Sequence, residues 1–345
     1  MAYTTIKKPS DYFDTRTYSA SGAGSISDVD FQPDFMWFKN RTVVGDHGLM
    51  DAVRGVNKII HSNDTNAEVT SNGTTNITAF TSNGFTYGAS SLLDTGSGTP
   101  VTWLWKANGA GSANTDGSIS STVSANTTSG FSIVSYTGTG ANATVGHGLG
   151  VAPKMIFVKG RNTSSINWLT GGTNISSNWG SSLHLNITGG LDTYNYWQNQ
   201  APNANTFALA TDSANNESGM ALIAYCFADV QGYSKFGSYI GNNSATDGTF
   251  FYTGFKPAMI IIKKTDNGQW TIFDNKRNPS NAVRAMLVPN GTDVELSQNE
   301  NNMDFLSNGV KMYNGDGVFN AGGSTYIYMA FAEEPLVGDN PATAR

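Results

Sequence analysis

The sequence has a single cysteine, and this scarcity excludes both a disulfide framework and a cysteine-based metal site. The cysteine, Cys226, lies within an apolar run, where a buried and unreactive thiol is expected. Charged residues make up only 13% of the 345 residues, and no stretch shows sustained helical periodicity of apolar residues. The longest nearly apolar run, 219–228, is too short to cross a bilayer as a helix. These absences favour a β-rich globular protein.

Basic clusters and metal-binding motifs are also missing. The net charge of −6 and the pI near 5.1 argue against a nucleic-acid or acidic-membrane surface and favour a protein or a sugar as partner. No nucleophile motif or carboxylate pair stands out, so we expect no enzyme activity. The N-terminus lacks a signal-peptide segment, so synthesis in a cytoplasm is expected. No metal site or cofactor is expected, because the four histidines are isolated from one another: His47, His61, His147 and His184.

Glycine, asparagine, serine and threonine are abundant, which is typical of short strands joined by turns. Within this composition a nine-residue pattern occurs three times, at 31–39, 151–159 and 255–263. Each copy contains a proline, a spacer, four consecutive apolar residues and a lysine: Pro33 and Lys39, Pro153 and Lys159, Pro257 and Lys263. Proline fits the start of a strand, and apolar residues without alternation need cover on both faces. Each copy therefore predicts a central strand, with the lysine where the strand emerges into water.

A second apolar strand follows each of these strands at a nearly constant distance. Either 74 or 75 residues separate each proline from the alanine that ends the second strand, at 101–107, 222–228 and 326–332. A tyrosine followed by small or turn-forming residues precedes each proline. The constant spacing indicates three tandem copies of one unit of about 100 residues.

The sequence thus predicts an all-β chain of three tandem antiparallel β-sandwich repeats of jelly-roll-like type. A barrel would fit the same short strands, and the sandwich is a preference. The flexible linker is inferred from small and polar residues. The expected boundaries are an N-terminal arm (1–10), the first repeat (11–107), the linker (108–126), the second repeat (127–230), the third repeat (231–335) and a C-terminal tail (336–345).

An aspartate and an arginine three residues apart occur in two of the repeats. Asp51 and Arg54 follow the first proline, and Asp274 and Arg277 follow the third, whereas Thr170 stands at the matching spacing in the second repeat. Such a pair could bind an anion or a substrate. Its absence from one repeat favours a structural ion pair that fixes a loop.

The interior of the second repeat is rich in aromatic residues among asparagine, serine, threonine and glycine. Sugar rings stack on aromatic rings while amide side chains hydrogen-bond their hydroxyl groups, so this composition predicts a glycan-binding surface. The alternative is that the same aromatic residues form the core of the second repeat or its contact with a neighbouring chain. The residues concerned are Trp168, Trp179, Tyr194, Tyr196 and Trp197.

Several segments carry a resemblance to a known domain: 3–6 with 9–13, 241–242 with 253–257, 326–333 and 341–345. They resemble an uncharacterised repeat domain of virion and tail-fibre-like proteins from tailed, mostly marine, bacteriophages. The resemblance covers nearly the whole chain and is weakest in the second repeat. It implies a virion component with a role in host recognition, and it supplies no catalytic residues.

We therefore expect a bacteriophage virion structural protein, a tail fibre or surface appendage that contributes to recognition of a host-surface glycan. The expected partners are other virion proteins and further copies of the chain, with a trimer favoured by analogy with phage fibres. Neither nucleic acid binding nor membrane insertion is expected. One alternative is a capsid decoration or tail adaptor protein that grips its neighbour with the N-terminal arm. Another is a polysaccharide-degrading tailspike enzyme, which needs convergent carboxylates in a cleft.

Overall fold

The computed structural model describes residues 4–89, 98–297, 302–315 and 317–343. These residues are almost entirely strands and turns. The helices among them are one 3-10 turn, η1 (Pro9–Asp11), and one short α-helix, α1 (Ser213–Asn216). The named strands pair in antiparallel fashion within several sheets, and none of these sheets closes on itself. None of the helices in these ranges is long and apolar enough to span a membrane.

We keep the names first, second and third repeat for the three segments defined in the sequence analysis; the first contains a six-stranded sheet and a three-stranded sheet. The larger sheet has the order β1-β9-β3-β4-β5-β6 and the smaller one β2-β8-β7. The bounds are β1 (Phe13–Thr17), β2 (Gly24–Ile26), β3 (Phe35–Asn40), β4 (Gly48–Asp51), β5 (Lys58–His61), β6 (Val69–Thr70), β7 (Ile77–Thr81), β8 (Gly84–Tyr87) and β9 (Pro100–Trp105).

The second repeat has a seven-stranded sheet of order β10-β11-β12-β18-β14-β15-β16 and the separate pair β13-β17. Residues 108–126, which were expected to be a flexible linker, contribute β10 and β11 to this sheet, so that expectation is wrong. Small polar residues form strands here because Val123 packs into the core of the second repeat while β11 pairs along β12. The bounds are β10 (Ser112–Asn114), β11 (Ser121–Asn126), β12 (Phe131–Thr137), β13 (Ala143–Gly146), β14 (Met155–Gly160), β15 (Leu169–Gly172), β16 (Leu183–His184), β17 (Thr206–Leu209) and β18 (Ala221–Phe227).

The third repeat has a four-stranded sheet, β19-β27-β21-β22, together with a three-stranded sheet, β20-β26-β25, and the pair β23-β24. Its four-stranded order matches β1-β9-β3-β4 in the first repeat and β12-β18-β14-β15 in the second. The bounds are β19 (Ser234–Ile240), β20 (Phe250–Tyr252), β21 (Phe255–Lys264), β22 (Trp270–Asp274), β23 (Ala285–Met286), β24 (Leu296–Ser297), β25 (Met303–Leu306), β26 (Gly309–Met312) and β27 (Thr325–Pro335).

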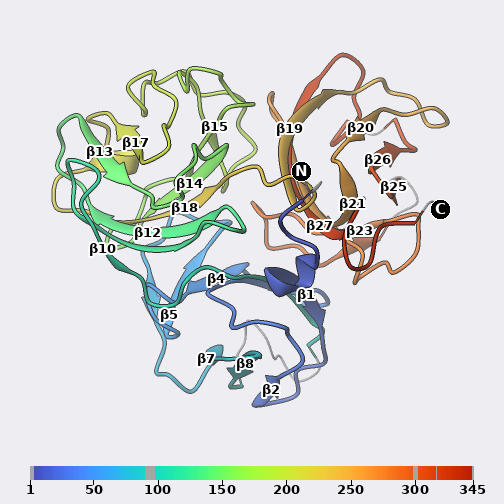
Figure 1. Cartoon of the computed structure of the whole chain (residues 1–345), viewed down its shortest axis with the longest axis horizontal. Helices are drawn as coiled ribbons and strands as arrows, with labels where there is room; N and C mark the ends of the chain where they lie inside the picture. The colour runs from blue at the N-terminus through green and yellow to red at the C-terminus, as the bar shows by residue number, and fades with distance from the viewer. Residues whose placement is uncertain (1–3, 90–97, 298–301, 316, 344–345) are drawn as a thin grey trace.

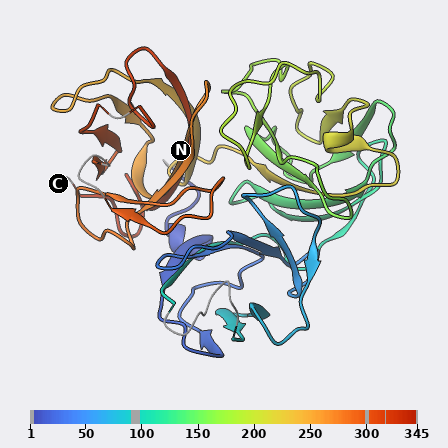
Figure 2. The ribbon, with the colours of Figure 1, turned by 180° about the vertical axis from the view of Figure 1, so that it is seen from behind.

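The three matching sheets surround a common centre, and the smaller sheets lie outside them (Figures 1 and 2). The proline-led strands β3, β14 and β21 explain this arrangement, because successive side chains of a strand point to opposite faces. In β3, Phe35 and Trp37 point into a core shared by all three repeats, whereas Met36 and Phe38 point into a core that belongs to the first repeat alone. The same alternation occurs in β14 and β21. The predicted burial of both strand faces is confirmed.

At the centre of the shared core, three aromatic rings meet, one from the closing strand of each repeat. The ring centroid of Trp105 lies 6.4 Å from that of Phe227 and 5.5 Å from that of Phe331, and the latter two are 6.0 Å apart. Ile6 of the N-terminal arm is also buried in this core, so the arm adds to the packing of the chain. The inner faces of the three large sheets thus depend on one another for burial.

The lysines at the ends of the proline-led strands do not emerge into water. Lys39, Lys159 and Lys263 are all buried. Each Nζ donates to backbone carbonyls of the following loop, as Lys159 Nζ does to the Ile166 oxygen at 2.6 Å. Burial lowers the pKa of each ammonium group to about 8. The expectation of an exposed lysine was wrong because a polar end group that finds carbonyl partners can be buried with its apolar stem.

Replacing Phe227 by alanine tests the shared core. The substitution removes a fully buried ring that contacts Trp105 and Phe331, so the free energy of unfolding in urea is expected to fall by about 3–5 kcal/mol. The matched control is Phe250→Ala, at a partly exposed phenylalanine, where a change within about 0.5 kcal/mol is expected. A variant in which only the second repeat unfolds early, while the rest melts as in the wild type, would contradict a shared core.

Candidate functional site

The tryptophans proposed to bind a glycan are core residues. Trp168, Trp179 and Trp197 are fully buried. Trp168 donates its ring N–H to the His61 carbonyl at 2.7 Å, and Trp197 donates to Ser182 Oγ at 2.8 Å. A ring enclosed in this way has no free face for a sugar. The three tryptophans are therefore part of the core, as the alternative interpretation expected.

The two tyrosines of the same segment differ from each other. Tyr196 is buried apart from its edge, and its hydroxyl donates to Asp192 Oδ2 at 2.7 Å. Tyr194 is 52% exposed and is the one large aromatic side chain of the predicted set that solvent reaches. A single ring of this kind does not make the predicted glycan surface. The sequence could not separate core from surface here, because the composition of the segment is the same for both.

The Asp51–Arg54 pair lies at the interface between the first and second repeats; we call each interface between two repeats a seam. Both side chains are fully buried and form an ion pair, and Arg54 also contacts Glu68, which in turn pairs with Arg161 of the second repeat at 2.9 Å. Tyr225 of the second repeat donates its hydroxyl to Asp51 Oδ2 at 2.7 Å. The expected structural ion pair is present, and it joins two repeats as well as fixing a loop.

The seam between the third and first repeats has the same construction. Asp274 and Arg277 are fully buried, and Arg277 Nε lies 2.6 Å from Asp274 Oδ2. Arg277 also pairs with Glu295, which in turn pairs with Arg41 of the first repeat. Trp103 takes the place of the tyrosine and donates its ring N–H to Asp274 Oδ2 at 3.0 Å. Spacing could have found the outer arginines, because Arg41 and Arg161 both follow their prolines by eight residues. No comparable spacing indicates the glutamates.

At the seam between the second and third repeats, a backbone hydrogen bond found in the other two seams is present, but the charged side chains are replaced. Leu191 N donates to the Thr265 carbonyl at 2.9 Å, as Glu68 N does to Arg161 and Glu295 N to Arg41. Strand register places Gly172, paired with Met155, where Asp51 pairs with Phe35 in the first repeat. Thr170, which matched by spacing, is therefore two residues away from the true equivalent. These polar clusters lie between repeats, and their central aspartates and arginines are fully buried.

An open groove lies elsewhere, where the third repeat begins. It has a volume of about 390 Å³ and is lined by residues of the β18–β19 turn and of the end of β20, among them Asp229, Gln231, Lys235 and Tyr252. Tyr252 is 54% exposed. Lys235 Nζ lies 2.9 Å from Asp229 Oδ2, so a cation and an anion are held together beside the ring. This combination of an accessible ring with charged donors and acceptors suits a polyhydroxylated ligand.

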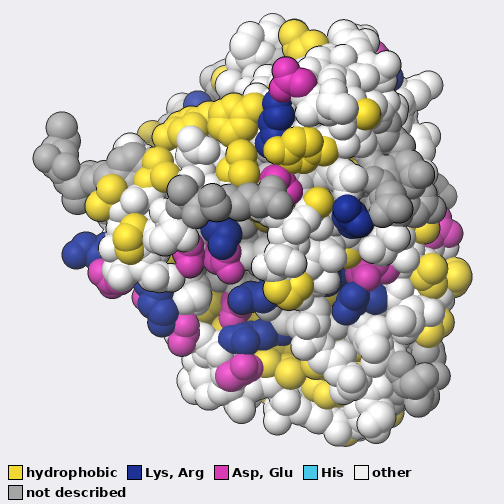
Figure 3. Space-filling view, turned by 90° about the vertical axis from the view of Figure 1, so that its right-hand side faces the viewer, with side chains coloured by type: hydrophobic (Ala, Val, Ile, Leu, Met, Phe, Trp, Pro, Cys, Tyr) yellow, Lys and Arg dark blue, Asp and Glu magenta, His cyan; other side chains and the backbone are white. Residues whose placement is uncertain are grey.

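Tyr252 continues into an exposed apolar patch, which we define as Ile240, Phe250 and Tyr252. These side chains are 63%, 44% and 54% exposed. Phe250 and Tyr252 point outward from β20 while Phe251 between them is buried, and Ile240 is joined to this strand through the bond from Thr249 Oγ1 to its carbonyl. Figure 3 shows the right-hand side of the view in Figure 1, and on this face hydrophobic side chains gather in the upper half beside basic and acidic ones. Sequence reasoning missed the patch, although three consecutive aromatic residues in one strand cannot all face inward.

Substitutions in the seam between the first and second repeats should separate the loss of one charge from the loss of both. Asp51→Asn removes the fully buried counter-ion of Arg54, leaving Glu68 as its one remaining partner among the ion pairs described, and is expected to lower the free energy of unfolding by about 3–5 kcal/mol. Asp51→Leu combined with Arg54→Met should cost less, because no buried charge remains unpaired. The control is Asp11→Ala, whose partner Lys8 is half exposed, with an expected effect below about 1 kcal/mol. A double variant less stable than Asp51→Asn would refute this account of the pair.

The glutamates of the two charged seams should make stability depend on acid pH. Burial opposes their ionisation, but the arginines beside them hold the pKa of Glu68 and of Glu295 below the ordinary value of 4.5. A carboxylate whose pKa is lower in the folded state adds stability above its unfolded pKa and loses it as pH falls through the folded pKa. The wild type should therefore lose stability below about pH 4.5, and Glu68→Gln with Glu295→Gln should lose less over the same range. Equal acid sensitivity of both proteins, measured by urea unfolding between about pH 5 and 3, would contradict this.

Comparison with known proteins places the chain in a family. No curated protein and no solved structure matches the chain. A family described as a domain of unknown function, DUF7483, matches residues 8–335, from the end of the N-terminal arm to the last strand. Because this match covers nearly the whole chain, the protein belongs to the DUF7483 family.

Proposed function

We propose that the protein is a structural component of a bacteriophage particle, a tail fibre or another surface appendage, that binds a host-surface glycan. In this proposal the chain consists of three repeats of one two-layered β unit, and its location is the virion. Other virion proteins and further copies of the chain are its partners, with a trimer favoured by analogy with phage fibres. The resemblance to phage virion proteins supports the location, and the groove of the third repeat supports the binding role.

The observation that carries the binding role is the groove at Tyr252. Carbohydrate recognition combines stacking on an exposed ring with hydrogen bonds to charged or amide side chains, and Tyr252 lies with Lys235, Asp229 and Gln231 around one opening. The neighbouring Phe250 and Ile240 extend the apolar surface beyond the groove. The buried tryptophans of the second repeat no longer support the proposal, which now rests on the third repeat.

The decoration or adaptor alternative gains less support. It relied on an N-terminal arm free to grip a neighbouring protein. Ile6 is instead buried in the chain's own core, and the backbone carbonyl of Lys7 accepts a hydrogen bond from Asp339 N of the C-terminal tail at 3.2 Å. The enzyme alternative finds no support in this groove, because Asp229 is the one carboxylate among its described lining residues.

A pair of tyrosine variants tests the binding role. Tyr252→Ala is expected to weaken binding to host cells, or to a host polysaccharide on a glycan array, by about tenfold or more, because the stacking ring is lost. The matched control is Tyr194→Ala, which removes an equally exposed tyrosine outside the groove and should leave binding and melting temperature unchanged. Equal binding of the wild type and Tyr252→Ala would overturn the role of the groove.

The location is tested separately by immunogold electron microscopy of intact phage particles. Label at the tail or fibre tips is expected. Label over the head would favour a decoration protein, and unlabelled particles would refute both virion assignments.

A further inference from the structure

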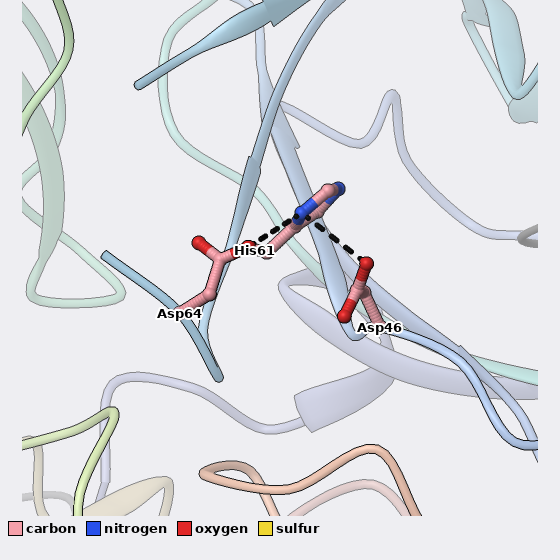
Figure 4. A group of neighbouring side chains, drawn as sticks. All are labelled: Asp46, His61 and Asp64. Atoms are coloured by element: carbon pink, nitrogen blue, oxygen red, sulfur yellow. Dashed lines mark hydrogen bonds and ion pairs between the residues drawn. The ribbon is translucent and has the colours of Figure 1, made fainter. Parts of the chain in front are cut away.

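Two carboxylates and a histidine of the first repeat converge on one point outside the groove. His61 ends β5, Asp64 follows it in the next turn, and Asp46 comes from the loop before β4. Figure 4 shows both aspartates directed at the same ring nitrogen from different sides. His61 Nδ1 lies 3.2 Å from Asp64 Oδ2 and 3.6 Å from Asp46 Oδ2, and one ligand atom of each residue lies within 4.8 Å of the others.

These separations suit ligands of one metal ion. Bonds of about 2.1 Å place neighbouring ligand atoms about 3.0 Å apart in octahedral geometry and about 3.4 Å apart in tetrahedral geometry. The two distances from His61 Nδ1 are close to these values, and a small rotation of Asp46 would bring the wider one within range. The second oxygen of each carboxylate is already held, Asp46 Oδ1 by Asn63 Nδ2 at 2.7 Å and Asp64 Oδ1 by the Asn66 N–H at 2.9 Å. Hydrogen bonds of this kind orient metal ligands.

The corresponding histidine of the second repeat provides an internal comparison. His61 and His184 occupy equivalent places, because the carbonyl of each accepts a hydrogen bond from a tryptophan of the following repeat, Trp168 or Trp270. His184 has one carboxylate partner, Asp192, at Nε2, while its Nδ1 lies 3.2 Å from the Trp168 carbonyl, and Asp192 accepts a second bond from the Tyr196 hydroxyl. The first repeat thus has two carboxylates beside its histidine, whereas the second repeat has one.

The first repeat therefore has one more carboxylate beside its histidine than the second repeat has. The single Nδ1 position of the imidazole can donate to only one of the two carboxylate oxygens beside it, and Asp64 Oδ2 accepts a further bond from Asn66 Nδ2 at 2.7 Å. Lys39 interacts electrostatically with Asp46, and Lys159 with Asp64, but the Nζ of each lysine donates to backbone carbonyls rather than to these carboxylates. A cation between the three ligand atoms would balance both negative charges and accept the Nδ1 lone pair.

We propose that Asp46, His61 and Asp64 bind one divalent transition-metal ion. An imidazole nitrogen with two carboxylate oxygens favours Zn²⁺ or Mn²⁺ over Ca²⁺ and Mg²⁺, which prefer oxygen ligands alone. Water would complete the coordination. All three side chains are partly exposed, so an ion can enter from solvent.

The position of the site gives the ion a structural role. The carbonyl of His61 is bonded to Trp168 of the second repeat, and Ser62 Oγ donates to the Pro289 carbonyl of the third repeat at 2.7 Å. Binding at His61 would therefore stabilise a loop that contacts both other repeats. The proposal does not depend on the glycan groove and concerns different residues.

Titration of the metal-free full-length protein tests the site. After treatment with a chelator and dialysis, isothermal titration calorimetry with ZnCl₂ or MnCl₂ should show one ion bound per chain, and the melting temperature should rise with ion concentration. The same titration with CaCl₂ should give binding at least about tenfold weaker. Electron paramagnetic resonance of Mn²⁺ provides an independent measure of the bound ion.

Matched variants assign the binding to these residues. Asp64→Asn and His61→Gln should each abolish the thermal shift or weaken binding by about tenfold to a hundredfold. Asp192→Asn, at the equivalent histidine pair of the second repeat, should bind the ion as the wild type does. Absence of binding at up to about 1 mM ion, or binding that Asp64→Asn and His61→Gln leave unchanged, would overturn the proposal.

Discussion

The structure depends on the packing of three sheet faces against one another. A sheet that buries only one face leaves the other in need of cover, and here each large sheet finds that cover in the other two repeats. The rings of Trp105, Phe227 and Phe331 meet where the faces converge, so no repeat can withdraw without exposing aromatic surface of the others. The smaller sheets then enclose the outer faces with cores of their own.

The three seams around this core share an equivalent backbone hydrogen bond, but only two of them contain a buried ion pair among the described residues. Two of them bury an aspartate paired with an arginine, and the aspartate accepts a hydrogen bond from the adjacent repeat, from the Tyr225 hydroxyl in one and from the Trp103 ring N–H in the other. Buried ion pairs add little net stability compared with apolar packing, but they penalise incorrect pairing of surfaces. The charged seams can therefore specify which repeat lies beside which, whereas the second–third seam is joined by backbone hydrogen bonds such as that from Leu191 N to the Thr265 carbonyl.

Much of the strand arrangement was predictable from residue patterns. The prolines and four-residue apolar runs locate β3, β14 and β21, since no other pattern explains an unbroken apolar run of that length between turns. The paired charges at Asp51 and Asp274 were also recognisable. The sequence did not indicate that the repeats share a core, because a strand buried on both faces reads the same whether its cover comes from its own repeat or from a neighbour.

The functional candidates were harder to predict for a related reason. Trp197 and Tyr252 each follow other aromatic residues in the sequence, yet one is enclosed and the other exposed. Burial of a ring depends on residues distant in the chain, such as the Ser182 hydroxyl that accepts the indole N–H of Trp197. Likewise, Asp46 and His61 come together only because β4 and β5 pair.

Differential scanning calorimetry of the full-length protein tests the shared core most directly. A single core predicts one cooperative transition in which the calorimetric enthalpy equals the van't Hoff enthalpy. Two or three separate transitions, with a calorimetric enthalpy well above the van't Hoff value, would show that the repeats unfold independently and would contradict the account.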